Sequence, residues 1–142
     1  MEKTPLLYIV DDSPDYRLLV QIVFKRFLPD YTLRFFESGN DLRHHALRTQ
    51  ERPGLILLDR HMPGQDGAQV LQLLKQHPFW QTVPVVMVSS DASEEEMEEC
   101  YRMGANSFLQ KPIGFEPLRQ LLVSTCYYWL SLNKQVTIST VS

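Results

Sequence analysis

Short apolar runs recur along this chain, separated by longer segments in which apolar residues are spaced differently. The runs at residues 6–10, 55–58 and 83–88 are almost uniformly apolar. Strands that are covered on both faces of a sheet read as continuous apolar runs, whereas strands with one wet face alternate. These three runs therefore predict buried strands, and weaker runs at residues 31–36 and 108–110 predict two more.

The segments between the runs predict helices. After the first run, Ser13 suits an N-cap and Pro14 the first helical position, and apolar residues follow at helical spacing. Asp66 can cap a later helix, and Gly104 suits the position just after another. The expected helices start at residues 14, 38, 66, 93 and 116, and the second, fourth and fifth should end near residues 50, 103 and 130.

Strand and helix alternate five times, which indicates an α/β fold. Parallel neighbours joined by right-handed crossovers leave few topologies. We expect a doubly wound sheet of five parallel strands in the flavodoxin-like order 2-1-3-4-5, within one domain at residues 1–130 and followed by a C-terminal tail at residues 131–142. In such sheets the functional crevice lies at the carboxyl ends of the strands.

Polar residues stand where four of the expected strands end. They are Asp11 and Asp12 after the first strand, Asp59 after the third, Ser89 after the fourth and Lys111 after the fifth. A single aspartate at a strand end is usually a turn or cap residue, and a lysine before proline is usually just solvated. Four such features on one edge of a sheet favour a shared function instead.

Three converging carboxylates repel one another unless a cation compensates their charge. Mg²⁺ is a hard, oxygen-seeking cation that suits such a group. A carboxylate can also attack phosphorus and form an aspartyl phosphate. Lys111 would bring a positive charge, and Ser89 a hydroxyl donor, to the phosphoryl oxygens. These residues predict a phosphoryl-transfer site that uses a divalent cation.

Four segments together resemble the receiver domain of two-component response regulators: YIVDD, LILLDRHMPGQDG, PVVMVSS and GANSFLQKP. The resemblance covers residues 6–130. It implies that Asp59 accepts a phosphoryl group from a phosphohistidine of a sensor histidine kinase or a phosphotransfer protein. It also implies that Mg²⁺ or Mn²⁺ is bound by Asp59, directly by Asp12, through water by Asp11, and by the backbone carbonyl of His61.

The same resemblance implies roles for further residues. Lys111 and Ser89 would contact the phosphoryl group, and Phe108 stands at the position of an aromatic switch. His61 and Asp91 occupy positions that tune dephosphorylation in this family. On this interpretation the chain is not an enzyme with a separate substrate, because it catalyses at most its own phosphorylation and dephosphorylation.

The family pattern also implies a cis peptide bond between Lys111 and Pro112, which proline allows. Two further stretches, CYRMGANSFLQKPIGFEPL and YYWL, resemble stand-alone, single-domain regulators of phytochrome-type sensor kinases. Few residues follow the last expected helix, too few for a helix-turn-helix module. We therefore expect no output domain, and an output that consists of contact with a protein target or phosphate relay.

Composition narrows the class of protein. The chain has 142 residues, of which 44% are hydrophobic and 22% charged, as in a globular domain. Its formal net charge of −3 gives no reason to expect nucleic-acid binding. No apolar stretch is long enough to span a bilayer, and residues 1–5 are too short and polar for a secretory signal. With Cys100 and Cys126 as buried thiols, we expect a cytoplasmic protein that binds neither DNA nor a membrane.

Three alternatives could use the same fold. A nucleotide- or flavin-binding protein needs a phosphate-cradling, usually glycine-rich loop after the first strand, where this chain has Asp-Asp-Ser-Pro-Asp. A Mg²⁺-dependent phosphatase needs a cap region and a second catalytic acid two residues after Asp59, where His61 stands. A degenerate receiver that only binds partners stays open, although the intact acidic set favours phosphorylation.

Other polar residues have simple structural interpretations. His44, His45 and His77 have no partner at metal-ligand spacing and are expected to be exposed. The glutamates at residues 94–96 lie where negative charge favours a helix N-terminus. Ser93 and the last of these glutamates have the spacing of a capping box.

The last helix predicts an interface. One stripe should cover the sheet: Leu118, Leu121, Leu122, Thr125 and Trp129. Four apolar residues fall largely off this stripe: Val123, Tyr127, Tyr128 and Leu130. Aromatic residues with few charges are typical of interface cores. We expect a homodimer through the fourth helix, last strand and fifth helix, and the β-branched residues 136–141 can add a strand to a partner. The alternative is that the tail folds back and hides these aromatics.

Overall fold

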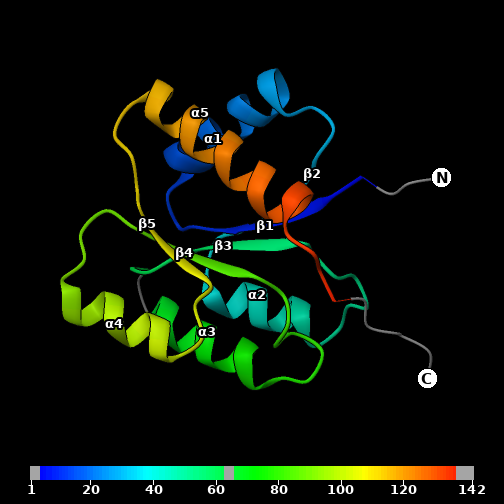
Figure 1. Ribbon diagram of the computed structural model, residues 1–142, viewed down its shortest axis with the longest axis vertical. Coiled ribbons are helices and arrows are strands. Elements are labelled where there is room, and N and C mark those ends of the chain that lie inside the picture. Colours follow the sequence, from blue (N-terminus) through cyan, green and yellow to red (C-terminus); the bar gives the residue numbers. More distant parts are fainter. Residues whose placement is uncertain (1–3, 63–65, 137–142) are drawn as a thin grey trace.

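The computed structural model describes residues 4–62 and 66–136. Within them, five strands and five α-helices alternate along the chain (Figure 1). The strands are β1 (Leu6–Val10), β2 (Thr32–Phe36), β3 (Leu55–Asp59), β4 (Val85–Ser89) and β5 (Ser107–Gln110). The helices are α1 (Pro14–Phe27), α2 (Gly39–Ala46), α3 (Gly67–Gln76), α4 (Glu94–Arg102) and α5 (Phe115–Cys126), which continues into a π-helical segment, η1 (Tyr127–Leu132).

The strands form one parallel sheet in the order β2-β1-β3-β4-β5, which confirms the expected fold class. Helices α1 and α5 cover one face, and α2, α3 and α4 cover the other (Figure 1). Successive side chains of β1 serve the two faces in turn. Leu7 and Ile9 pack with α1 and α5, whereas Tyr8 and Val10 pack with the other three helices. None of the helices in the described ranges is long and apolar enough to cross a membrane.

Three expected caps form at helix starts. Their bonds run from Tyr16 N to Ser13 Oγ (3.2 Å), from Ala68 N to Asp66 Oδ1 (3.0 Å) and from Glu96 N to Ser93 Oγ (3.1 Å). At the end of α4, Gly104 takes a φ of 108°, which a residue with a Cβ rarely adopts. The predicted capping box is only half formed. Ser93 Oγ donates to Glu96 Oε1 at 3.4 Å, but within the described residues the Glu96 carboxylate makes no hydrogen bond with the backbone N–H of Ser93.

Two elements are shorter than the sequence pattern predicts. Helix α2 ends at Ala46, and the chain then turns, with two backbone N–H groups donating to the carbonyl of His45. Strand β4 begins two residues later than expected, at Val85. The residue before it is Pro84, which has no N–H to donate to the sheet.

The prediction that all three histidines are exposed is wrong for His45. Its Nε2 lies 2.9 Å from the hydroxyl of Tyr8, which in turn donates to Glu51 at 2.7 Å. Arg34 donates two hydrogen bonds to the same carboxylate, and these bonds hold the pKa of Glu51 at about 2. His45 is therefore half-buried over the edge of the sheet, because the buried Tyr8 needs polar partners.

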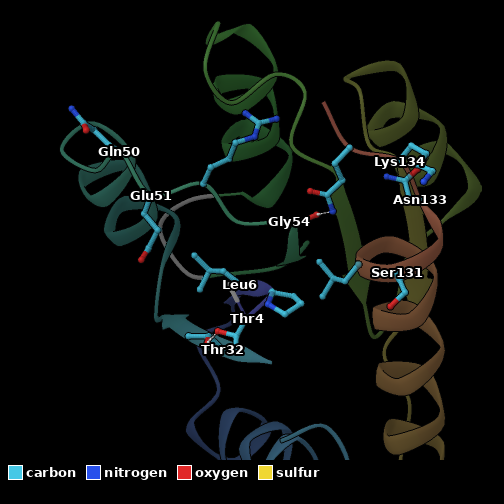
Figure 2. A pocket seen from close by; sticks show the side chains of 13 residues that line it. Thr4, Leu6, Thr32, Gln50, Glu51, Gly54, Ser131, Asn133 and Lys134 are labelled. Atoms are coloured by element: carbon cyan, nitrogen blue, oxygen red, sulfur yellow. Dashed lines mark hydrogen bonds between the residues drawn. The ribbon is translucent and has the colours of Figure 1, made fainter. Parts of the chain in front are cut away.

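The C-terminal segment folds back onto its own domain as far as Val136. Trp129 and Leu130 pack against the core beneath α1 and α5, and the Gln135 amide donates to the carbonyls of Gly54 and Trp129. A hollow of about 980 Å³ remains between this segment and the amino ends of the strands (Figure 2). The predicted strand at residues 136–141 lies almost entirely outside the described residues, and the division at residue 130 stays a prediction.

The start of α3 depends on a close backbone approach. A Cβ at Gly67 would lie 2.3 Å from the carbonyl oxygen of Asp59 and 3.0 Å from the Cα of Arg60. Both are backbone atoms, so the loop after β3, which begins at Asp59, would have to move. At Gly54, in contrast, a Cβ would first meet the ends of the Leu130 and Gln135 side chains, which can rotate away.

We predict that Gly67→Ala lowers the free energy of unfolding by about 2 kcal/mol, because overpacking against backbone outweighs the gain in helix propensity. Gly54→Ala is the matched control and should cost less than about 1 kcal/mol. Urea unfolding followed by circular dichroism measures both. Equal stabilities of Gly67→Ala and wild type would contradict the predicted clash.

Candidate functional site

The pairing of the strands brings the sequence-predicted polar residues to one edge of the sheet. Val10 of β1 pairs with Leu58 of β3, so the residues that follow them, Asp11 and Asp59, are neighbours. Ser89 of β4 pairs with the residue that precedes Lys111. The four strand ends therefore meet where a doubly wound sheet places its functional crevice.

An acidic group lies at the centre of this edge. One carboxylate oxygen from each of Asp11, Asp12 and Asp59 lies within 4.8 Å of the others. Asp11 is 2% exposed and Asp59 7%, whereas Asp12 is open to solvent. A set of only carboxylate oxygens, with one side open to water, suits Mg²⁺ or Mn²⁺, which take oxygen ligands and retain waters. The backbone N–H of His61 donates to Asp59 at 3.3 Å, and its carbonyl as a ligand stays a prediction.

Lys111 reaches into the acidic group. Its Nζ lies 2.7 Å from Asp11 Oδ2 and 3.9 Å from Asp59 Oδ2. The ammonium group also sits 4.0 Å from the centre of the Tyr16 ring. The predicted cis bond after Lys111 is wrong: no peptide bond among the described residues is cis, and this one is trans. The trans isomer of a bond before proline is the intrinsically preferred one.

The surroundings of Asp59 determine the pKa of its carboxyl group. Burial and the charge of Asp11 raise the pKa of Asp59 to about 6, although Lys111 and the N–H of His61 oppose the shift. Burial and the charges of Asp11 and Asp59 also raise the pKa of Tyr16, which is held as a neutral phenol. A single lysine therefore does not compensate the three carboxylates. The site disfavours a further negative charge and favours a cation.

The loop between β4 and α4 carries the predicted hydroxyl. Ser89 is 2% exposed, and its Oγ donates to the carbonyl of Asp91 at 3.0 Å and accepts from the N–H of the same residue at 3.3 Å. Ser89 and Phe108 line one small hollow of about 200 Å³. Phe108 is half-buried and packs against the core beneath α4. The predicted switch residues are thus close together, and the hydroxyl is bonded within its own loop.

An open pocket of about 400 Å³ borders the side chain of Asp59. His61 lines this pocket, and its Nε2 lies 3.1 Å from the carbonyl oxygen of Asp91, which also lines it. The residues that line the pocket are Asp12, Asp59, His61, Ser90, Asp91, Glu96 and Lys111. Both residues predicted to tune dephosphorylation therefore border the space from which a water would approach Asp59.

Sequence reasoning missed three residues of this region. The ring of Tyr16 lies against the ammonium group of Lys111. Arg60, which follows Asp59, is 6% exposed, and Glu96 of α4 lines the pocket. Arg60 forms an ion pair with Asp66. Arg60 comes after Asp59 and not directly after the apolar run at residues 55–58, so the pattern of strand ends did not single it out.

Comparison with known proteins agrees with this geometry. The family model of the response regulator receiver domain matches residues 7–123. Response regulator Rcp1 of Synechocystis sp. is 30% identical over 132 residues, which are 88% of this chain and 88% of that protein.

Solved structures show the same fold. The Mn²⁺-bound form of response regulator Rcp1 superposes with a TM-score of 0.83 at 27% identity, covering 94% of this chain and 99% of that chain. The phosphorylated cyanobacterial phytochrome response regulator RcpA gives a TM-score of 0.87 at 23% identity, covering 94% and 99%.

The family model spans residues 7–123, which is most of the chain. This chain belongs to the response regulator receiver domain family, the phosphoacceptor signalling domains of two-component systems.

Proposed function

We propose that Asp59 is the phosphoacceptor and that it takes the phosphoryl group from a phosphohistidine. The observation that carries this proposal is a buried carboxylate with two further carboxylates and a lysine around it, open to solvent through one pocket. A carboxylate oxygen of Asp59 would form the new bond to phosphorus as the bond from phosphorus to the imidazole nitrogen breaks. The electron pair of that bond and a proton remain with the histidine that leaves.

Asp11, Asp12 and Asp59, with the backbone carbonyl of His61, would hold the divalent cation, Mg²⁺ or Mn²⁺. The oxygen-only cluster supports this assignment, and so does the solved Mn²⁺-bound form of a relative. When bound, such a cation neutralises charge on the phosphoryl oxygens. The chain's own groups do the rest of the work: the buried walls orient Asp59, and Lys111 adds positive charge beside it.

Ser89 and Phe108 would form the switch. A hydroxyl that leaves the carbonyl of Asp91 for a phosphoryl oxygen exchanges a neutral hydrogen bond for a stronger, charge-assisted one. The shift of Ser89 would change the hollow that it shares with Phe108 and allow the ring to turn inward.

The same proposal sets the partners. A receiver domain interacts with a sensor histidine kinase or a phosphotransfer protein, and this chain would in turn signal by contact with a protein target in the cytoplasm. The formal net charge of −3 supports protein contact over direct DNA binding. No separate substrate is required, so the chain would act as a regulator and not as an enzyme in its own right.

A homodimer through α4, β5 and α5 extends the proposal. At the end of the last helix, Tyr127 is 57% exposed, Tyr128 50% and Leu132 53%. The fold-back covers Trp129 and Leu130 instead, so the chain hides part of the apolar face itself. Exposed aromatic residues next to few charges support an interface made by the remaining part.

Phosphorylation is tested with a small phosphodonor, such as acetyl phosphate, and Mg²⁺. The intact mass of the wild type should rise by one phosphoryl group, and Asp59→Asn should abolish the rise because the nucleophile is removed. Asp30→Asn, at an exposed position away from the site, is the control and should label normally. EDTA should block labelling, since the acidic group repels a phosphoryl anion without a cation. Equal labelling of Asp59→Asn and wild type would refute the assignment.

Self-association is tested by light scattering. If the tyrosines form an interface, Tyr127→Glu with Tyr128→Glu should turn a dimer into a monomer, because two buried charges oppose association. Leu47→Glu changes an apolar residue that is 69% exposed just after α2 and should leave the dimer intact. A wild type that is monomeric both with and without phosphodonor would rule out the dimer.

A further inference from the structure

The side chain of Glu96 is placed unlike those of the other acids at the start of α4. Its Oε2 is buried and makes no hydrogen bond within the part of the chain that the structure describes. The glutamates at residues 94 and 95 are exposed. Burying a carboxylate oxygen without a hydrogen bond is unfavourable, so an electrostatic interaction must offset that cost.

Two side chains from the loop after β3 face this oxygen. Nη2 of Arg60 lies 3.8 Å from it, and Nε2 of His61 lies 3.4 Å from it. These separations are within ion-pair range but do not give hydrogen-bond geometry to either partner. Glu96 therefore sits between two residues of the loop that carries the acceptor, and its position links α4 to that loop.

Arg60 supplies the fixed charge that holds Glu96. Its side chain is 8% exposed, and its Nε also lacks a hydrogen-bond partner among the described residues. Burial opposes the charge, yet Asp66 and Glu96 help to raise the pKa of Arg60 above its usual range. A buried guanidinium needs carboxylates around it. Asp66 at the start of α3 provides one and Glu96 provides the other.

Two polar contacts hold the imidazole of His61, one with α4 and one with the loop before that helix. Its side chain is 55% exposed, and Nε2 lies close to both Glu96 and the carbonyl oxygen of Asp91. The hydroxyl of Ser89 donates to that same carbonyl. When Ser89 moves toward a phosphoryl group, Glu96 would be the contact that keeps the imidazole across the pocket.

We infer that Glu96, held by Arg60, is a positioning residue that keeps His61 over the Asp59 pocket and so protects the aspartyl phosphate from water. In the reaction that it slows, a water oxygen bonds to phosphorus, the bond from phosphorus to the Asp59 oxygen breaks, and Asp59 returns to a carboxylate as inorganic phosphate and a proton leave. The inference rests on the proposed phosphorylation of Asp59, and it gives an α4 residue a role in the lifetime of the signal.

A matched pair of variants separates this role from a general effect of acidic residues at a helix start. Glu96→Ala removes a half-buried carboxylate that faces Arg60 and His61, and Glu95→Ala removes an exposed one from the same turn. Both variants lose a similar helix-dipole interaction, so an effect that they share reports on the start of the helix and not on the contact with His61. Only Glu96→Ala should shift the imidazole resonances of His61 in the NMR spectrum of the unphosphorylated protein. This readout does not depend on phosphorylation, so it tests the contact even if Asp59 is not labelled.

The decay of phosphorylated protein tests the function of the contact. After removal of the donor, Glu96→Ala should shorten the half-life by about threefold or more, the equivalent of one weak hydrogen bond. Glu95→Ala should match wild type. In a His61→Ala background the additional Glu96→Ala change should have no effect, because the side chain that Glu96 positions is gone.

Arg60→Lys retains the positive charge, so it should keep part of the wild-type lifetime of the phosphorylated protein. Glu96→Gln removes the negative charge, so it should behave like Glu96→Ala. An unchanged lifetime for Glu96→Ala would overturn the inference. An equal effect of Glu96→Ala with and without His61 would also overturn it, since Glu96 would then act by another route.

Discussion

Repulsion among carboxylates at the carboxyl edge of the sheet governs the behaviour of this receiver domain. Strands β1 and β3 are hydrogen-bonded neighbours, so the aspartates that follow them cannot avoid each other. Lys111 Nζ lies 2.7 Å from Asp11 Oδ2 but 3.9 Å from Asp59 Oδ2. The negative charge of Asp59 is therefore only partly compensated. Burial contributes most to the raised pKa of Asp59, and the charge of Asp11 adds to it. The fold thus holds like charges close together, which destabilises the site without a cation and favours the proposed binding of one.

The two loops that border the acceptor share their contacts, and this sharing connects chemistry to signalling. The hydroxyl of Ser89 and the imidazole of His61 both lie within hydrogen-bond distance of the carbonyl oxygen of Asp91. A change in one contact therefore alters the surroundings of the other. Arg60 and Glu96 tie the same loops to α4, and Phe108 lies beneath that helix. If Asp59 is phosphorylated as proposed, these packed groups offer a short route from Asp59 to α4.

The fold and the central site could be predicted from the sequence because both depend on local patterns. Uniformly apolar runs identify parallel strands, and strand order then determines which strand ends meet. Asp11, Asp59, Ser89 and Lys111 each follow or end such a run, so their convergence needs no side-chain detail.

Contacts between elements far apart in the sequence could not be predicted. The sequence indicated only that Glu96 places negative charge at the start of a helix. Its contacts with Arg60 and His61 depend on how α4 packs against the loop after β3. The sequence predicted an exposed His45, because nothing in residues near it indicates that the hydroxyl of the buried Tyr8 needs a hydrogen-bond partner there. The trans bond after Lys111 likewise depends on how the following loop closes, which neighbouring residues do not specify.

The charge state of Asp59 with and without a cation tests this account most directly. Carbon NMR of the labelled carboxyl group should show a titration midpoint near pH 6 in the absence of divalent ions, since burial and Asp11 raise this pKa to about 6. Saturating Mg²⁺ should move the midpoint to about 4 or below, because a bound cation favours the carboxylate. A midpoint at the ordinary aspartate value of about 3.9 without any cation, or no response to Mg²⁺, would contradict the account.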